Sequence, residues 1–307
     1  MARAGRPGNG ILDAFEWRGT LVVADMLGLV LRDASLCEIA AAEAALTASN
    51  RNPHRCVHRA RRALRRARAL IALGNRGDPA FAAVDAGLRR STRALSRLRD
   101  AAVVVETLDR LLKRKAMLAD SRAAMPLRED LVRQRGAILS RQRRRTPGFA
   151  SVLAQLRAAR EAVQSLDWTQ VKPRSVARAV KRSLRRIGKI EGKARRSRAG
   201  YLRHRWRRRL RRYNDQRTLL ANRLASAPLH GSAEAVELVR RLPDDGFDSA
   251  PHGKRLAMVS HVLGLERDMH LLRRFVRRTD AIGSGVRDRL LEAIEHRLRK
   301  LRARTGK

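Results

Sequence analysis

Apolar residues recur along most of the chain at the three-to-four-residue spacing of amphipathic α-helices. The clearest case follows Pro53, where alanine, leucine and isoleucine fall on one side of a helical projection and arginine and histidine cover the other side. No segment shows the sustained alternation of apolar and polar residues, bounded by turns, that a half-buried strand would need. The pattern therefore predicts an all-α fold.

Prolines, glycines and capping residues divide the helical pattern into segments. Asn52–Pro53 and Asp78–Pro79 each place a capping side chain before a proline at the first helical position, and Gly74 ends the helix between them. Further breaks are predicted at 125–126, 146–147, 172–173 and 227–253. The last of these stretches is rich in proline and glycine, so it is expected to be a loop around one short helix near residues 232–242.

The polar side of the helix after Pro53 is densely basic. Its residues are His58, Arg59, Arg61, Arg62, Arg65, Arg66 and Arg68. Like charges four residues apart on a helix repel each other, and this helix contains no aspartate or glutamate to offset them. We therefore expect a bound anion at this face, the alternative being a basic face that is merely solvated.

The composition extends this basic character to the whole chain. The 307 residues include 70 Lys and Arg against 29 Asp and Glu, a formal net charge of +41 at pH 7. Arginine supplies 61 of the basic residues, and its forked guanidinium group suits phosphate oxygens. Because the hydrophobic fraction of 44% is that of an ordinary globular protein, the chain is not a disordered basic tail. These values predict a folded, arginine-rich protein with a polyanionic partner.

The basic pattern recurs later in the chain. His204, Arg207, Arg208, Arg211 and Arg212 repeat the spacing of the basic helix after Pro53 at a constant offset of 146 residues. A second echo relates 95–100 to 263–268 at an offset of 168. Two echoes in the same order predict a tandem duplication, and we expect the helices that carry His58 and His204 to approach each other.

This ordered set of motifs resembles the CHAD family, named for conserved histidines in an α-helical domain. The resemblance rests on residues 57–68, on Arg99-Asp100 with Val103, on His204 with its following arginines, and on Leu263-Gly264 with Asp268. The chain departs from the family pattern where Ala102 replaces a second acidic residue and Asn214 a basic one. Tyr213 comes earlier than the family's aromatic residue.

The resemblance implies two pseudo-symmetric four-helix bundles with a basic central groove or pore, in a CHAD domain over residues 12–304. The first helical half would cover about 12–146 and the second about 147–304. It also implies non-catalytic binding of inorganic polyphosphate, with targeting to polyphosphate granules as a further implication. The expected polyphosphate-binding residues are His58, Arg61, Arg62, Arg65, Arg66, Arg68, Arg99, His204, Arg207, Arg208, Arg211 and Arg212.

The residues support the same ligand chemistry independently of the resemblance. A linear phosphate chain offers only oxygens and charge, so its receptor needs many forked donors and no platform for stacking bases. Aromatic residues make up only 3% of the chain. An arginine-rich DNA- or RNA-binding protein is the alternative, although no zinc-finger spacing, RNA-recognition aromatics or basic-zipper heptads are present.

We expect no enzymatic activity, no cofactor and no metal. The chain contains no Gly-x-x-x-x-Gly-Lys-[Ser/Thr] motif and no Glu-x-Glu-x-Lys start of the triphosphatase domain often fused to CHAD. His54 and His58 have metal-ligand spacing, but no acidic or cysteine ligand joins them. Asp100 and Asp268 are expected to hold arginine heads in position, and His58 and His204 either to donate to phosphate or to be buried structural residues.

The remaining features predict a reduced, soluble, cytoplasmic protein without a membrane partner. Cys37 and Cys56 form no disulfide or zinc pattern and are expected to be small core residues. The apolar stretch from Thr20 to Leu31 contains Asp25 and is shorter than the roughly 20 residues that a membrane span requires. Acidic residues precede it, unlike in a signal peptide.

Overall fold

The computed structural model describes residues 26–49, 52–74, 77–114, 121–145, 149–197, 199–226, 229–242 and 250–306. Within these ranges the secondary structure is helical and contains no strand, which confirms the all-α prediction. The helices are α1 (Met26–Thr47), α2 (Pro53–Ile71), α3 (Pro79–Ala94), α4 (Ser96–Leu112), α5 (Met125–Arg145), α6 (Ala150–Gln164), α7 (Pro173–Arg196), α8 (Gly200–Leu224), α9 (Ala233–Arg241), α10 (Ala250–Val276) and α11 (Ser284–Gly306).

Side-chain caps explain where several of these helices begin. The Asn52 side chain accepts a hydrogen bond from the backbone N–H of Arg55 at 3.1 Å, and Asp78 and Ser232 cap α3 and α9 in the same way. The predicted starts at Pro53 and Pro79 are confirmed. Gly74 follows α2 where a Cβ atom would lie only 2.1 Å from the Phe81 ring, so this turn requires glycine. The predicted break at 146–147 lies outside the described residues.

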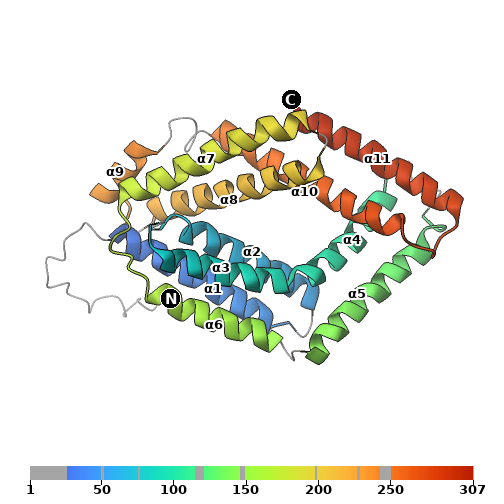
Figure 1. The fold of residues 1–307 in the computed structure, drawn as a ribbon, viewed down its shortest axis with the longest axis horizontal. Helices are drawn as coiled ribbons and strands as arrows, with labels where there is room; N and C mark the ends of the chain where they lie inside the picture. Colours follow the sequence, from blue (N-terminus) through green and yellow to red (C-terminus); the bar gives the residue numbers. More distant parts are fainter. Residues whose placement is uncertain are drawn as a thin grey trace, which may run out of the picture.

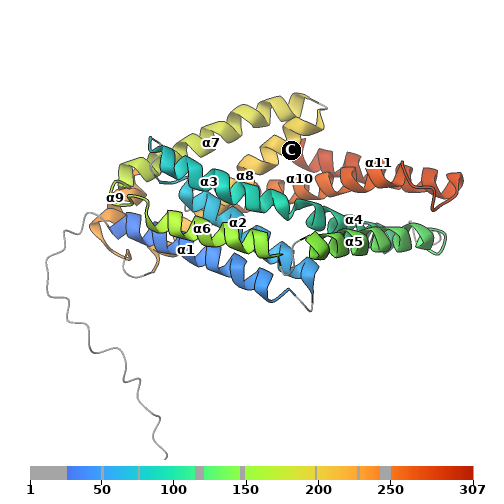
Figure 2. The ribbon, with the colours of Figure 1, turned by 60° about the horizontal axis from the view of Figure 1, so that its bottom comes forward.

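Two hydrophobic cores hold the helices together. The first core is formed by α1, α2, α3, α6, α7, α8, α9 and the ends of α4 and α10 that adjoin them. The second core is formed by the rest of α4 and α10 with α5 and α11. Figure 1 shows α4–α5 and α10–α11 extending together from the main body, and Figure 2 shows the same arrangement from a second direction.

The two cores do not confirm the expected division into one four-helix bundle per half. Each core combines helices from both halves of the chain, and α4 and α10 contribute buried residues to both cores. In α4, Leu98 belongs to the first core and Val104 to the second. The tandem duplication stays a prediction, since the order of helices is compatible with it but the packing does not separate the halves.

The helices that carry His58 and His204 pack against each other, as expected. The Gln216 side chain of α8 donates to the backbone carbonyl of Ala69 in α2 at 3.2 Å, and Arg212 donates to that of Arg68 at 3.0 Å. These hydrogen bonds use the last carbonyls of α2, which have few partners within their own helix. The contact brings arginines of the two basic helices close enough to act on one another electrostatically.

The cysteines differ from the prediction. Cys37 is exposed and Cys56 is half-buried, so the expectation that both are core residues is wrong for Cys37. The buried side of α1 is formed by residues such as Leu31, Ile39 and Ala42, and Cys37 lies outside this stripe. Among the described helices, none combines the length and apolarity needed to cross a membrane.

Candidate anion-binding site

Four helices bring a group of arginines together at the α2–α8 contact. We call this group the arginine cluster: Arg61 and Arg65 from α2, Arg99 from α4, Arg207 and Arg211 from α8, and Arg267 from α10. Six guanidinium groups from helices far apart in sequence therefore act on one another electrostatically. Such an arrangement favours an anionic ligand.

Arg207 and Arg211 are the least compensated members of the cluster. Burial lowers the pKa of Arg207 to about 10, and Asp268 opposes this while Arg267, Arg65 and Arg61 add to it. Burial and the neighbouring Arg65 and Arg207 lower the pKa of Arg211 to about 9. Neither side chain forms an ion pair with a carboxylate of the described residues. Their surroundings therefore destabilise the charged form of both guanidinium groups, and a bound anion would stabilise it.

Room for the Arg207 side chain depends on Gly264 of α10. A Cβ atom at this position would lie 3.2 Å from Nη2 and 3.3 Å from Nε of Arg207. That is closer than ordinary van der Waals contact, so a larger residue would push the guanidinium group away. The glycine of the predicted Leu263-Gly264 motif thus has a physical role at this site.

The other cluster arginines are held by partners. Arg61 donates to the Thr92 carbonyl and to Ser96 Oγ, both near the α3–α4 junction. Arg65 pairs with Asp215 at 2.6 Å, and Arg99 pairs with Glu106 at 2.8 Å. These contacts orient the guanidinium groups. They also reduce the conformational entropy that the arginine side chains would lose when a ligand binds.

Two aspartates from the predicted motifs position Arg267. The Arg267 guanidinium group lies 2.7 Å from Asp100 and 3.6 Å from Asp268. The expectation that these carboxylates hold arginine heads is confirmed. Burial raises the pKa of Asp268, although Arg207 and Arg267 oppose the rise.

Three of the predicted binding residues lie against neighbouring helices. Arg66 pairs with Glu38 of α1 at 2.7 Å, and Arg68 pairs with Asp85 of α3 at 2.9 Å. Arg212 reaches the same Asp85 at 3.4 Å. The sequence of α2 contains no acidic residue, so these ion pairs could not be expected from it. Their carboxylates come from other helices. Of the remaining predicted residues, Arg62 and Arg208 are exposed.

His58 and His204 lie at the edge of the cluster and are exposed. Partial burial lowers the pKa of His58, and Arg99 contributes next. Partial burial and then Arg267 lower the pKa of His204. Both imidazoles are therefore neutral at pH 7 and donate through a single N–H unless an anion raises their pKa.

The lowered histidine pKa values predict how stability depends on pH without ligand. The unfolded chain takes up these protons near the ordinary pKa of 6.5, whereas the folded protein resists them. The free energy of unfolding should thus fall as the pH drops below 6.5. Urea unfolding at about pH 5.5 and about pH 7.5 measures the fall, which should be smaller in the His58→Gln, His204→Gln double variant. An unchanged pH dependence in that variant would contradict the shifts.

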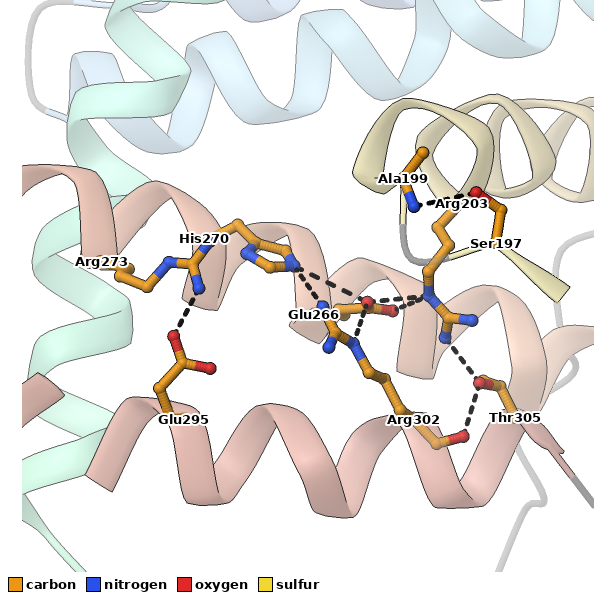
Figure 3. Close-up of polar contacts among 9 residues, drawn as sticks. All are labelled: Ser197, Ala199, Arg203, Glu266, His270, Arg273, Glu295, Arg302 and Thr305. Carbon is orange, nitrogen blue, oxygen red and sulfur yellow. Dashed lines mark hydrogen bonds and ion pairs between the residues drawn. The ribbon is translucent and has the colours of Figure 1, made fainter. Parts of the chain in front are cut away.

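A polar network around Glu266 joins α10 to α8 and α11 (Figure 3). Glu266 is 2% exposed and pairs with Arg203 of α8 at 2.7 Å and with Arg302 of α11 at 3.3 Å. Arg203 also donates to the Thr305 hydroxyl at 2.6 Å. Burial alone would raise the pKa of Glu266, but contacts from His270 and Arg203 hold it below the ordinary value. The network fixes the helix that carries Arg267 and Asp268.

Sequence reasoning missed Arg267 and Glu266 as parts of the site. The signal for Arg267 was present, because the offset of 168 residues relates it to Arg99. Glu266 stood in the same echo, but nothing in the local pattern showed that its partners would be Arg203 and Arg302. No group of three His, Cys, Asp or Glu side chains suited to a metal occurs in the described part of the chain.

A comparison with protein families supports the assignment suggested by this geometry. The family model described as CHAD domain matches residues 33–237, which include His58, His204 and most of the arginine cluster. The chain belongs to the CHAD family. The match ends in α9, so α10, with Arg267 and Glu266, lies beyond the matched CHAD segment. Neither the curated proteins nor the solved structures contain a match to this chain.

Proposed function

We propose that this CHAD protein binds inorganic polyphosphate at the arginine cluster without chemically altering it. The observation that carries the proposal is the pair Arg207 and Arg211, which are half-buried among other arginines and lack carboxylate partners within the described residues. An anion with charge spread along its length would offset both. CHAD domains are associated with polyphosphate-related proteins in general, which agrees with this proposal.

The chemistry of the cluster fits bare phosphate better than nucleic acid. Each charge-assisted hydrogen bond from arginine to a phosphate oxygen contributes about 1.5 to 3 kcal/mol when well ordered. Base recognition on single strands would need exposed aromatic rings for stacking. The aromatic residues of α8 nearest the cluster in sequence, Trp206 and Tyr213, are buried in the first core.

We further propose that the functional CHAD domain includes α10 and α11, in keeping with the expected extent of 12–304. Arg267 belongs to the cluster, and the Glu266 network joins α8 to both α10 and α11. A site confined to residues 33–237 would lose one cation and the carboxylate pair that orients it. Association with cytoplasmic polyphosphate granules is part of the same proposal.

Competition between polyanions tests the proposed ligand. Long-chain polyphosphate should displace duplex DNA and RNA of equal phosphate concentration at physiological salt, because the cluster offers forked donors and no stacking platform. Fluorescence anisotropy with a labelled DNA duplex measures the displacement. Equal competition, or preference for nucleic acid, would overturn the proposal in favour of an arginine-rich nucleic-acid-binding function.

A further inference from the structure

A pocket opens at the N-terminal end of α2, next to the arginine cluster. Its volume is about 470 Å³, and its charged and imidazole lining consists of His54, Arg55, His58, Arg99, Glu106 and Arg135. These residues come from α2, α4 and α5. His58 and Arg99 connect the pocket to the cluster. Arg99 is a member of the cluster, and the cluster residues Arg65 and Arg211 lower the pKa of His58.

The pocket carries an excess of positive charge. Glu106 is its one lining carboxylate, and both of its oxygens already accept hydrogen bonds from Arg99, at 2.8 and 3.2 Å. Arg135 forms no ion pair with any described carboxylate. His54 Nδ1 is buried and has no hydrogen-bond partner among the described residues. Arg135 and the His54 imidazole therefore line the pocket without a carboxylate partner among the described residues.

A terminal phosphate of a polyphosphate chain matches this pocket better than an interior phosphate does. An interior phosphate has one ionisable oxygen, whereas a terminal phosphate has a second, with a pKa of about 6 in simple phosphate esters. A terminal group thus brings the larger negative charge and exchanges a proton near the range in which histidine titrates. The open N-terminal turn of α2, with Asn52 as its cap, adds favourable partial charge at the same place.

We infer that this pocket binds the terminal phosphates of a polyphosphate chain, with His54, His58 and Arg135 as donors, while interior phosphates lie on the arginine cluster. The inference rests on the proposed function, because it assigns one end of the same ligand. His58 lies between the pocket and the arginine cluster, so its imidazole is expected to donate to phosphates in either place.

Proton uptake should accompany binding at this pocket. Burial is the main cause that lowers the pKa of His54, followed by Arg135 of α5, while Glu106 of α4 opposes it. For His58, burial, Arg99 and then Arg65 and Arg211 act in the lowering direction, and Glu106 again opposes. A bound dianion reverses these effects and raises both pKa values. At pH 7 the two imidazoles should therefore be more protonated in the complex than in the free protein.

The experiment compares tripolyphosphate, in which most phosphates are terminal, with long-chain polyphosphate, in which few are. The double variant His54→Gln, Arg135→Gln should bind tripolyphosphate about tenfold or more weakly by calorimetry, because it removes two donors. Its affinity for the long chain should change less than about threefold, since the cluster is intact. The matched control Arg185→Gln, Lys189→Gln changes two exposed residues of α7 and should affect neither ligand.

Each outcome distinguishes this inference from the proposed function. If the double variant binds tripolyphosphate as the wild type does, while long chains still bind, the chain-end pocket is wrong and the proposed function stands. If the wild type binds neither ligand, the proposed function fails. If orthophosphate displaces tripolyphosphate at equal concentration, the pocket is a free-phosphate site, which also overturns the inference. Imidazole NMR signals of His54 and His58 should shift toward the protonated form on adding tripolyphosphate.

Discussion

Replacing Arg207 and Arg211 together by methionine is expected to weaken polyphosphate binding strongly and yet to stabilise the ligand-free protein. Two charge-assisted contacts of about 1.5 to 3 kcal/mol each would be lost, so the affinity should fall by about a hundredfold or more. The same change removes two half-buried charges that have no carboxylate partner within the described residues. After allowance for solvent screening, the free energy of unfolding should rise by about 1 to 2 kcal/mol.

Binding calorimetry and urea unfolding measure the two effects on the same preparations. Methionine preserves most of the packing volume, so a gain in stability is attributable to the removed charge. A double variant with methionine at Arg185 and Lys189, both exposed on α7, is the matched control and should alter affinity and stability little. If the Arg207 and Arg211 variant unfolds more easily than the wild type, the two arginines support the structure and the cluster is not a preformed anion site.

Replacing Glu266 by leucine is expected to have the opposite effect on stability. Arg203, which is 9% exposed, would remain buried without its carboxylate partner, and Arg302 would lose its contact as well. Removing one partner of a buried ion pair costs about 3 to 5 kcal/mol, and thermal unfolding followed by circular dichroism would show a marked fall in Tm.

Changing Arg203 and Glu266 together to leucine should recover much of that loss, because no uncompensated charge then stays buried. The comparison of single and double variants gives the coupling between the two residues. A loss below about 1 kcal/mol in the single Glu266→Leu variant would show that water reaches Glu266 and Arg203 and that the network does not anchor α10.

Much of the local structure followed from short stretches of sequence. The starts of α2, α3 and α7 depend on a capping residue or a proline at the first helical position, and such signals act within one turn. The basic face of α2 and its echo in α8 were equally visible, because helical periodicity alone separates the two faces. The contact between these helices was predicted from the repeat and is present.

The assignment of individual arginines could not be made in this way. Arg65 and Arg211 occupy equivalent positions of the repeat, yet Arg65 pairs with Asp215 of another helix while Arg211 remains among other arginines. The difference lies in which helix packs alongside, and a carboxylate on a distant helix leaves no mark on the local pattern. The exposure of Cys37 was mispredicted for a related reason, since residue type alone does not say which side of α1 is covered.

Local patterns were thus sufficient for the helices and for the two basic faces, because propensity, capping and helical periodicity depend on neighbours in sequence. Tertiary packing decided the rest. It built each core from both halves of the chain, brought Arg267 to the cluster and placed Glu266 between Arg203 and Arg302. Burial and the distances between charges arise only when helices far apart in the chain meet, and these quantities set the pKa values and the partners of the site.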